Sequence, residues 1–359
     1  MDLADLFTGP VPWLKERITP EEPGTRTICS AFRFYRNLSF YPFLPALSQS
    51  QKREIKSKLL NLFNTNDQQL CVSLDKCSTR ERTMLAERFL LPRDRTISEK
   101  PKREENGLQD ACVVITNSSI DSALINMGEH LTYSHYSAGF SDIKSGKEAI
   151  KKILSHLSRE TWACDTQYGY LNADPAKAGS GFRISALIHF PAIQLMRQQE
   201  QMMKALKAIG LIGSGTGDLT GKGGLTWISS RRSLGLSEEG VFMDFHEKLK
   251  KCMKLEEELS ESFIKGEKYK AEDKVFRAFH VLLSARILTF YEFLNLSSWV
   301  RLGVYFHLLR PELLRLLNYL LVKSSPEHIQ LAERSPLSPE ERDVKRAAMV
   351  RQVLKEYEN

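Results

Sequence analysis

The spacing of hydrophobic residues divides the chain into a mixed first part and a helical second part. Between Gln51 and Pro92, apolar residues recur at helical spacing in LLNLF and RTMLAERFLL, which predicts helices. The short apolar runs ACVVITN and SALINM are typical of paired strands, and FRISALIHFPAI is typical of a further strand. Because the strands are interspersed with helices without strict alternation, the pattern favours an α+β fold over a doubly wound sheet.

From Leu234 onward the pattern is helical. The segment SEEGVFMDFHEKLKKCMKLEEELSESF has glutamates near its start, lysines further on and an apolar stripe with a period of 3.6 residues, which predicts a long amphipathic helix. Runs such as HVLLSARILTFYEFL and ELLRLLNYLLV continue the helices from Asp273 to Tyr357. Ser338 followed by Pro339 is typical of a helix start, so we expect the last helix to begin there.

Two segments are expected to be loops. Residues Arg93 to Asn106 are charged and poor in apolar residues, which predicts a mobile loop. The glycine-rich run from Gly213 to Gly224 does not match a P-loop, because Lys222 is followed by Gly223, which has no hydroxyl for magnesium. We interpret this run as a flexible loop between a helix and a strand.

Composition indicates a globular protein. The chain has 359 residues, enough for two domains, and its 42% hydrophobic and 26% charged residues are ordinary values. The net charge of +7 is spread along the chain, so no nucleic acid partner is indicated. No stretch approaches the ~20 apolar residues of a membrane span. We therefore expect a cytoplasmic protein without a membrane partner.

Cysteines and histidines offer no metal site. The six cysteines lie far apart and form no CxxC pair, which is typical of reduced thiols in a cytosolic protein. His130, His135 and His156 lack the spacing of zinc ligands, so we predict no metal. The cysteines are Cys29, Cys71, Cys77, Cys112, Cys164 and Cys252.

A charged tract near the C-terminus offers a different kind of chemistry. Arg342 and Arg346 share one face of the predicted last helix, and Asp343 lies about 100° around its axis. Two guanidinium groups and a carboxylate suit a ligand that carries both a phosphoryl group and a guanidinium group. The same spacing is common on solvent-exposed helices, so the tract alone decides nothing.

Several segments, in order along the chain, resemble the motifs of one known family. The matches are Cys29 to Asn37 with SSRxRxARN, Ala86 to Leu90 with ERHL, Ile125 to Leu131 with NEEDHLR, Gly169 to Ser185 with GYLTxCPTNxGTGxRAS, Ala205 to Gly235 with a loop and an ISNQxTLG strand, and Arg342 to Ala347 with RDxxRA. These motifs resemble those of the phosphagen kinase superfamily, specifically the bacterial protein-arginine kinases, in which RDxxRA belongs to the phosphoarginine-binding domain. The resemblance implies an antiparallel sheet of the guanidino-kinase type, flanked by helices, over residues 1–265. It also implies an all-helical phosphoarginine-binding-like domain over residues 266–359, and a homodimer.

Position by position, the resemblance also implies that much of the family's catalytic machinery is absent. Gly128 stands where the family has its expected base, and Asp174 stands where it has a reactive cysteine. Arg33 and Arg183 remain from the cationic set that holds nucleotide phosphates. Further departures are Ala31 and Thr132 in place of arginines, Phe89 in place of the histidine of ERHL, and Met127 in place of a glutamate. In the following loop, the family's arginine corresponds to Ser214 or Ile212, and its glutamate has no counterpart, with Asp218 the nearest carboxylate.

These departures predict a pseudokinase. Loss of one preorganised transition-state donor costs about 10²–10³ in rate, and here several are missing. No cofactor is then required, and ATP with magnesium would matter only for residual activity. One alternative is an active protein-arginine kinase with a rearranged site, using Glu129 or Asp174 as base and Lys222 on a phosphate. Another is a purely structural interaction protein.

The leading hypothesis is a non-catalytic protein that binds phosphoarginine or acts as a scaffold in protein quality control or stress regulation. We assign Arg342 and Arg346 to the phosphoryl oxygens of phosphoarginine and Asp343 to its guanidinium group. The small side chain of Ala347 would let the helix pack closely against a neighbouring element. The competing interpretation is that the tract packs a domain or dimer interface. By resemblance, the expected partners are phosphoarginine-bearing proteins, a zinc-containing activator protein and a Clp-type AAA+ unfoldase.

Overall fold

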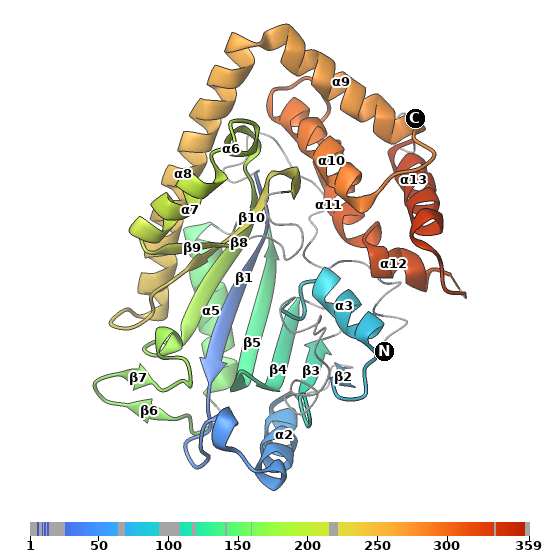
Figure 1. Ribbon diagram of the computed structural model, residues 1–359. Coiled ribbons are helices and arrows are strands. Elements are labelled where there is room, and N and C mark those ends of the chain that lie inside the picture. The colour runs from blue at the N-terminus through green and yellow to red at the C-terminus, as the bar shows by residue number, and fades with distance from the viewer. Residues whose placement is uncertain are drawn as a thin grey trace.

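The centre of the fold is an eight-stranded antiparallel sheet with strand order β2-β3-β4-β5-β1-β8-β10-β9 (Figure 1). A computed structural model describes Leu6, Gly9, Val11, Trp13 and residues 26–63, 69–92, 108–116, 120–140, 142–158, 160–214, 222–333 and 335–355. The strands of the sheet are β1 (Thr27–Arg36), β2 (Gln69–Ser73), β3 (Cys112–Thr116), β4 (Asp121–Met127), β5 (Glu129–Ala138), β8 (Phe182–His189), β9 (Leu211–Ser214) and β10 (Leu225–Ser230); β6 (Cys164–Asp165) and β7 (Gly169–Tyr170) form a separate small hairpin.

Helices flank this sheet and continue into a helical C-terminal region (Figure 1). The first set is α2 (Gln49–Phe63), α3 (Thr79–Glu87), α5 (Ile143–Leu157), α6 (Pro191–Leu195), α7 (Gln199–Ala208) and α8 (Glu238–Gly266), with short 3-10 turns η1 (Leu44–Ala46), η4 (Pro175–Lys177) and η6 (Lys222–Gly224). The second set is α9 (Lys268–Ser284), α10 (Phe290–Tyr305), α11 (Glu312–Lys323), α12 (Pro326–Leu331) and α13 (Pro339–Lys355). The predicted α+β class, with an antiparallel sheet followed by helices, is confirmed.

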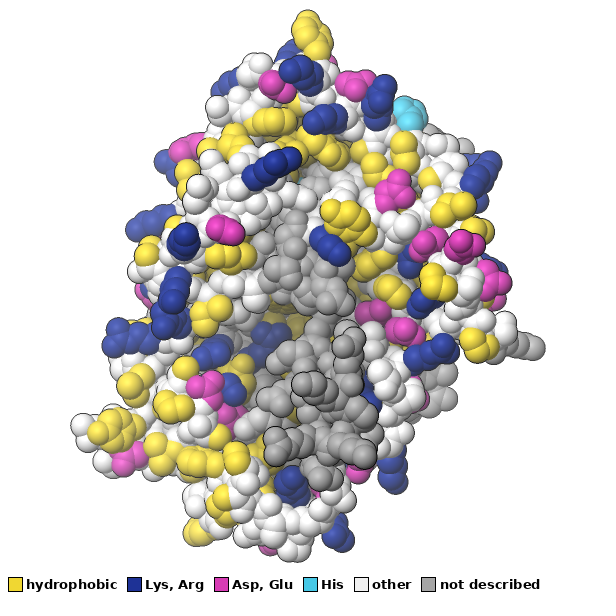
Figure 2. Space-filling model, in the orientation of Figure 1, with side chains coloured by type: hydrophobic (Ala, Val, Ile, Leu, Met, Phe, Trp, Pro, Cys, Tyr) yellow, Lys and Arg dark blue, Asp and Glu magenta, His cyan; other side chains and the backbone are white. Residues whose placement is uncertain are grey.

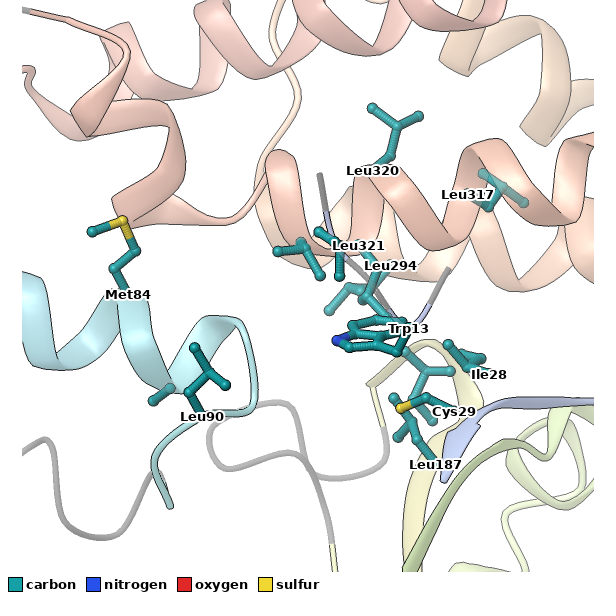
Figure 3. Packing of buried hydrophobic residues seen from close by; sticks show 14 of the residues in the cluster. Trp13, Ile28, Cys29, Met84, Leu90, Leu187, Leu294, Leu317, Leu320 and Leu321 are labelled. Atoms are coloured by element: carbon teal, nitrogen blue, oxygen red, sulfur yellow. The ribbon is translucent and has the colours of Figure 1, made fainter. Parts of the chain in front are cut away.

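Both faces of the sheet are covered, which explains the apolar character of its central strands. Side chains alternate between the faces of a strand, so Phe32 and Phe34 of β1 join a buried cluster with α2, α5 and α8. Cys29 and Ala31 face the other way, into a second cluster that includes α3 and helices α10, α11 and α13. In Figure 3, Trp13 lies in this second cluster, close to Leu294 of α10. The C-terminal helices thus share a core with one face of the sheet.

Two predictions of local structure were wrong, both because a short strand has little periodicity of its own. The region between Gln51 and Pro92, predicted as helical, also contains the five-residue edge strand β2 between α2 and α3. The glycine-rich run does not directly follow a helix, since β9 precedes it and pairs with β10 beyond it. Residues 215–221 of that run, and the predicted loop from Arg93 to Asn106, lie outside the described residues.

The start of the last helix is confirmed. The Ser338 hydroxyl accepts a hydrogen bond from the Glu341 amide at 3.2 Å, and the Glu341 carboxylate accepts one from the Ser338 amide at 2.7 Å. This reciprocal capping box satisfies two amides that the first helical turn would leave unpaired. The predicted boundary between residues 265 and 266 falls where α8 gives way to α9, and the division into two domains there remains a prediction.

A buried carboxylate joins the C-terminal helices to α3. Glu87, at the end of α3, accepts four hydrogen bonds: from the Ser325 hydroxyl at 2.7 Å, from the amides of Glu327 and His328 at 3.0 and 3.2 Å, and from His328 Nδ1 at 2.8 Å. It therefore satisfies the free amides at the start of α12 from a different part of the chain.

None of the described helices is long and apolar enough to cross a bilayer.

Buried histidines make the stability of this fold depend on pH. Burial lowers the pKa of His130 and His328 below the ordinary value of 6.5, and burial lowers that of His189 well below it. Unfolding lets these groups take up protons, so the stability present above pH 6.5 is lost as the pH falls below it. Each histidine that stays neutral at pH 5.5 in the folded state contributes about 1 kcal/mol to this loss.

We expect the free energy of unfolding, measured with urea, to be lower at pH 5.5 than at pH 7.5. In His189→Gln the difference between the two pH values should shrink, because glutamine does not titrate. Equal stability at both pH values would contradict this account.

Candidate functional site

A cleft of about 600 Å³ opens over one face of the sheet, opposite the face that carries the buried cluster of Phe32 and Phe34. Its floor consists of alternate residues of the central strands, and the end of α3 forms one wall. Figure 2 shows Lys and Arg side chains gathered in a hollow of the front face, over the sheet seen in Figure 1. The polar lining residues are Arg33, Tyr35, Thr132, Ser134, Tyr136, Lys177, Arg183, Ser185, Ser214 and Ser229.

The two arginines predicted as phosphate-binding remnants lie together in this cleft. Arg33 of β1 and Arg183 of β8 are directly opposite partners in the strand pairing. Arg33 donates from Nη1 to the Ser185 hydroxyl at 3.0 Å, and Arg183 donates from Nη2 to the carbonyl of Ala176 at 3.1 Å. Like charges directly opposite one another destabilise a sheet. An anion shared between the two guanidinium groups would remove that repulsion.

Lys177 adds a third cation, which the sequence analysis missed. Its Nζ lies 3.2 Å from Glu129 Oε1, 3.9 Å from Asp174 Oδ2 and 4.8 Å from the centre of the Tyr35 ring. Lys177 stands where the motif GYLTxCPTNxGTGxRAS has asparagine, so comparison with that motif could have revealed it. The cleft therefore presents two guanidinium groups and one ammonium group.

The position expected for the base also faces this lysine. Gly128 lies in the turn between β4 and β5 with a φ of +82°, a conformation that glycine adopts freely. A Cβ placed on Gly128 would lie 4.0 Å from Lys177 Nζ. At the position where the resemblance implies a base, this protein has no side chain, and an ammonium group lies nearby.

Glu129, proposed as base in the rearranged-site alternative, is a buried structural carboxylate. Only 1% of Glu129 is exposed, and it does not line the cleft. It accepts three hydrogen bonds: from Asn37 Nδ2 at 2.8 Å, from the amide of Ala173 at 3.0 Å and from Lys177 Nζ at 3.2 Å. With its oxygens engaged in this way, Glu129 has no access to a substrate in the cleft.

The other candidates of the rearranged site also lie outside the described lining. Asp174 accepts a hydrogen bond from the amide of Ala176 at 3.0 Å and so caps η4. Lys222 lies over the ring of Tyr291 at 4.7 Å. Of the two positions that correspond to the family's loop arginine, Ser214 lines the cleft and Ile212 does not. Asp218, the nearest carboxylate in that loop, lies outside the described residues. Within the described part of the chain, no carboxylate lines this cleft.

An aromatic column of Trp13, Phe89 and Trp227 adjoins the cleft, and Phe89 stands at the position of the histidine in ERHL. Phe89 follows α3 with a φ of +64°, and the hydrogen bonds from the amide of Phe89 to Ala86 and from that of Leu90 to Leu85 form a Schellman turn. Its ring lies 5.4 Å from that of Trp13 and 5.3 Å from that of Trp227. The sequence shows phenylalanine at the histidine position, but contacts among three aromatic residues so distant along the chain could not be predicted from it.

In the C-terminal tract, Arg346 and Ala347 belong to the protein interior. Arg346 is 2% exposed and donates from Nε to the carbonyl of Ser324 at 2.7 Å and from Nη1 to that of Leu288 at 2.9 Å. It also donates to Asp343. Ala347 is buried in the second cluster. In this arrangement Arg346 binds α13 to neighbouring segments, and it does not offer the direct phosphoryl contact that we assigned to it.

Arg342 and Asp343 are the accessible part of the tract. The side chain of Arg342 is 26% exposed, and its Nη1 lies 3.9 Å from Glu327 Oε1 of α12. The Asp343 side chain is 22% exposed, and Arg346 fixes one of its oxygens. One guanidinium and one oriented carboxylate therefore lie together at the junction of α12 and α13. Among the described residues, no group of three or more His, Cys, Asp or Glu side chains could hold a metal ion.

Comparison with known proteins defines the class. Residues 50–259 match the family model of the ATP:guanido phosphotransferase C-terminal catalytic domain, so the chain belongs to the ATP:guanido phosphotransferases. Residues 268–359 match the protein-arginine kinase McsB C-terminal domain. Within the superfamily, the chain belongs to the protein-arginine kinase family.

Curated relatives of this family span nearly the whole chain. The sequence is 30% identical to a protein-arginine kinase of Moorella thermoacetica, over 91% of this chain and 93% of that protein. It is 28% identical to a protein-arginine kinase of Shouchella clausii, over 96% of this chain and 95% of that protein.

Solved structures share the fold. A lombricine kinase aligns with a TM-score of 0.54 and 17% identity over 69% of this chain and 70% of that one. The duplicated taurocyamine kinase of Schistosoma mansoni, solved with bound transition state analog components, aligns with a TM-score of 0.57 and 19% identity over 69% of this chain and 35% of that one. At these identities the likeness concerns the fold alone.

The structural role of Glu129 can be measured. Glu129→Ala should lower the free energy of unfolding by about 3 kcal/mol, because it leaves the buried donors of Asn37 and Lys177 without their acceptor. Asp174→Ala, which removes a half-exposed carboxylate three residues from Lys177, is the matched control and should cost less than about 1 kcal/mol. Urea denaturation of both variants measures the difference, and equal small losses would show that Glu129 does not hold the site together.

Proposed function

We propose that this protein-arginine kinase homologue binds phosphoryl groups without transferring them and recognises phosphorylated arginine on other proteins. The observation that carries the proposal is the charge of the cleft. Its described lining holds Arg33, Lys177 and Arg183 and no carboxylate. Such a lining favours anions and disfavours a cationic acceptor.

Phosphoryl transfer to arginine needs a carboxylate as well as cations. The acceptor guanidinium carries a positive charge, and a nearby carboxylate has to orient it and take its proton. Cations then stabilise the phosphoryl group in flight. In this cleft, the position for the carboxylate is Gly128, and the nearby ammonium of Lys177 already pairs with Glu129 at 3.2 Å. The described lining therefore lacks the carboxylate that would orient the acceptor.

The cleft retains part of the donor half. Arg33 and Arg183 lie opposite each other on adjacent strands and would rest against the phosphates of a nucleotide or another phosphorylated ligand. The described lining offers hydroxyls and cations but no carboxylate to hold magnesium. Binding would therefore depend on the two arginines.

The second part of the proposal concerns the C-terminal tract. We assign Arg342 to the phosphoryl oxygens and Asp343 to the guanidinium of phosphoarginine, with Arg346 as the residue that positions Asp343. The motif match and the accessibility of Arg342 and Asp343 support this assignment. The buried hydrogen bonds of Arg346 also suit the alternative in which the tract only packs the helices together. Binding measurements distinguish the two.

The partners follow from the resemblance and form part of the same proposal. Phosphoarginine-bearing proteins would be the ligands. A zinc-containing activator protein and a Clp-type AAA+ unfoldase would be the associates, in protein quality control or the stress response, and the working form would be a homodimer.

Titration with free phosphoarginine tests recognition at the tract. The intact chain should bind, and Arg342→Ala should weaken binding at least ten-fold, because it removes the charged donor of the phosphoryl group. Lys345→Ala, on the same helix but paired with Glu333 at 2.8 Å, should bind like the parent and serves as control. Absence of binding, or equal affinity in Arg342→Ala and Lys345→Ala, would favour the purely structural interpretation.

Titration with inorganic pyrophosphate tests the cleft separately. Arg183→Ala should weaken pyrophosphate binding about ten-fold or more, since one of two opposed guanidinium groups is lost. Arg231→Ala removes an exposed arginine just after β10 and controls for net charge. Equal affinity in the two variants would show that the cleft arginines do not form an anion site.

A further inference from the structure

Two cysteines lie close together on the outer strands of the sheet, away from the cleft and the tract. Cys71 is exposed on β2, the edge strand, while Cys112 on β3 is fully buried. In the pairing of these strands, Cys71 is opposite Val114 and Cys112 is opposite Ser73. Residues two apart on a strand point to the same face, so Cys71 and Cys112 are diagonal neighbours on one face of the sheet.

The surroundings of Cys71 stabilise a thiolate. Lys56 of α2 reaches this face, where its Nζ donates to the Ser73 hydroxyl at 3.0 Å. A hydrogen bond from the Cys112 thiol, together with the charge of Lys56, lowers the pKa of Cys71 to about 7 against the opposing effect of burial. The same hydrogen bond to Cys71, together with burial and the charge of Cys71, raises the pKa of Cys112, so that thiol keeps its proton.

We propose that Cys71 is a site of reversible thiol modification by low-molecular-weight disulfides, with Cys112 as the positioning residue that donates its S–H to the reactive sulfur. The Cys71 thiolate attacks one sulfur of the disulfide RS–SR. The RS–SR bond breaks, a Cys71 S–SR bond forms, and the RS⁻ leaving group takes a proton from water. Cys71 is oxidised to a mixed disulfide and one equivalent of RSH is released.

The strand geometry favours the mixed disulfide over an internal bridge. Diagonal neighbours on antiparallel strands have Cα atoms about 7–8 Å apart. A disulfide spans up to about 7 Å without movement of the backbone. Cys112 is therefore close enough to donate a hydrogen bond to Cys71 but is placed unfavourably to displace the bound thiol. The adduct should persist until an external thiol removes it.

The test uses the full chain and glutathione disulfide as probe. Modification of Cys71, followed by peptide mass spectrometry from pH 5.5 to 9.5, should rise with a midpoint near pH 7, and at pH 6 should be about five-fold faster than for an ordinary exposed thiol. Exposed Cys164 on β6 is the internal comparison. A single mixed disulfide at Cys71 is the expected product. Equal rates at both cysteines, or an internal bridge between Cys71 and Cys112, would overturn the proposal.

Two variants of Cys112 separate hydrogen bonding from packing. Cys112→Ala removes the donor and should move the midpoint of Cys71 upward by about one pH unit or more, while Cys112→Ser keeps a donor and should preserve the low midpoint. Should Cys112→Ala fail to fold, Lys56→Met on half-buried Lys56 removes the other stabilising group and should shift the midpoint in the same direction. Unchanged pH profiles in Cys112→Ala and Lys56→Met would overturn the role assigned to these residues.

Discussion

The buried carboxylate of Glu129 holds the surroundings of the cleft together. It fixes Asn37 at the end of β1, the amide of Ala173 and the ammonium of Lys177 around one side chain. The next residue, His130, accepts a hydrogen bond from the Leu38 amide at 3.0 Å and so extends the same network. Because this carboxylate is buried and saturated, it shapes the cleft and cannot serve as a base within it. The described lining of the cleft therefore holds Arg33, Lys177 and Arg183 and no carboxylate.

Many of the family motif residues that remain in this chain support the fold. Arg36 of the SSRxRxARN segment donates to the carbonyls of Ser180 and Gly181 at 3.1 and 3.2 Å, and its guanidinium lies 3.5 Å from the centre of the Tyr170 ring. Glu87 of the ERHL segment binds the start of α12. Gly128 and Phe89, which depart from the motifs that the sequence resembles, line the cleft. Matching motif residues thus hold elements in place, while two that depart from the motifs lie at the cleft.

The sequence was sufficient for those parts of the structure that repeat a pattern. Long amphipathic helices such as α8 and the capped start of α13 could be predicted because periodicity and capping chemistry are local. The short edge strand β2 and the aromatic column at Phe89 could not, because both depend on partners far along the chain. Site residues divide in the same way. Sequence comparison found Arg33 and Arg183, but only packing shows that Arg346 is buried and that Lys177 enters the cleft.

We propose that a cleft whose described lining holds cations and no carboxylate binds phosphoryl groups but does not move them to arginine. The most direct measurement incubates the full chain with ATP, magnesium and an arginine-containing protein, and detects phosphoarginine by mass spectrometry under conditions that spare the acid-labile P–N bond. The account predicts no phosphoarginine above the level of an incubation without the chain. A reproducible signal that disappears in Arg183→Ala would contradict it.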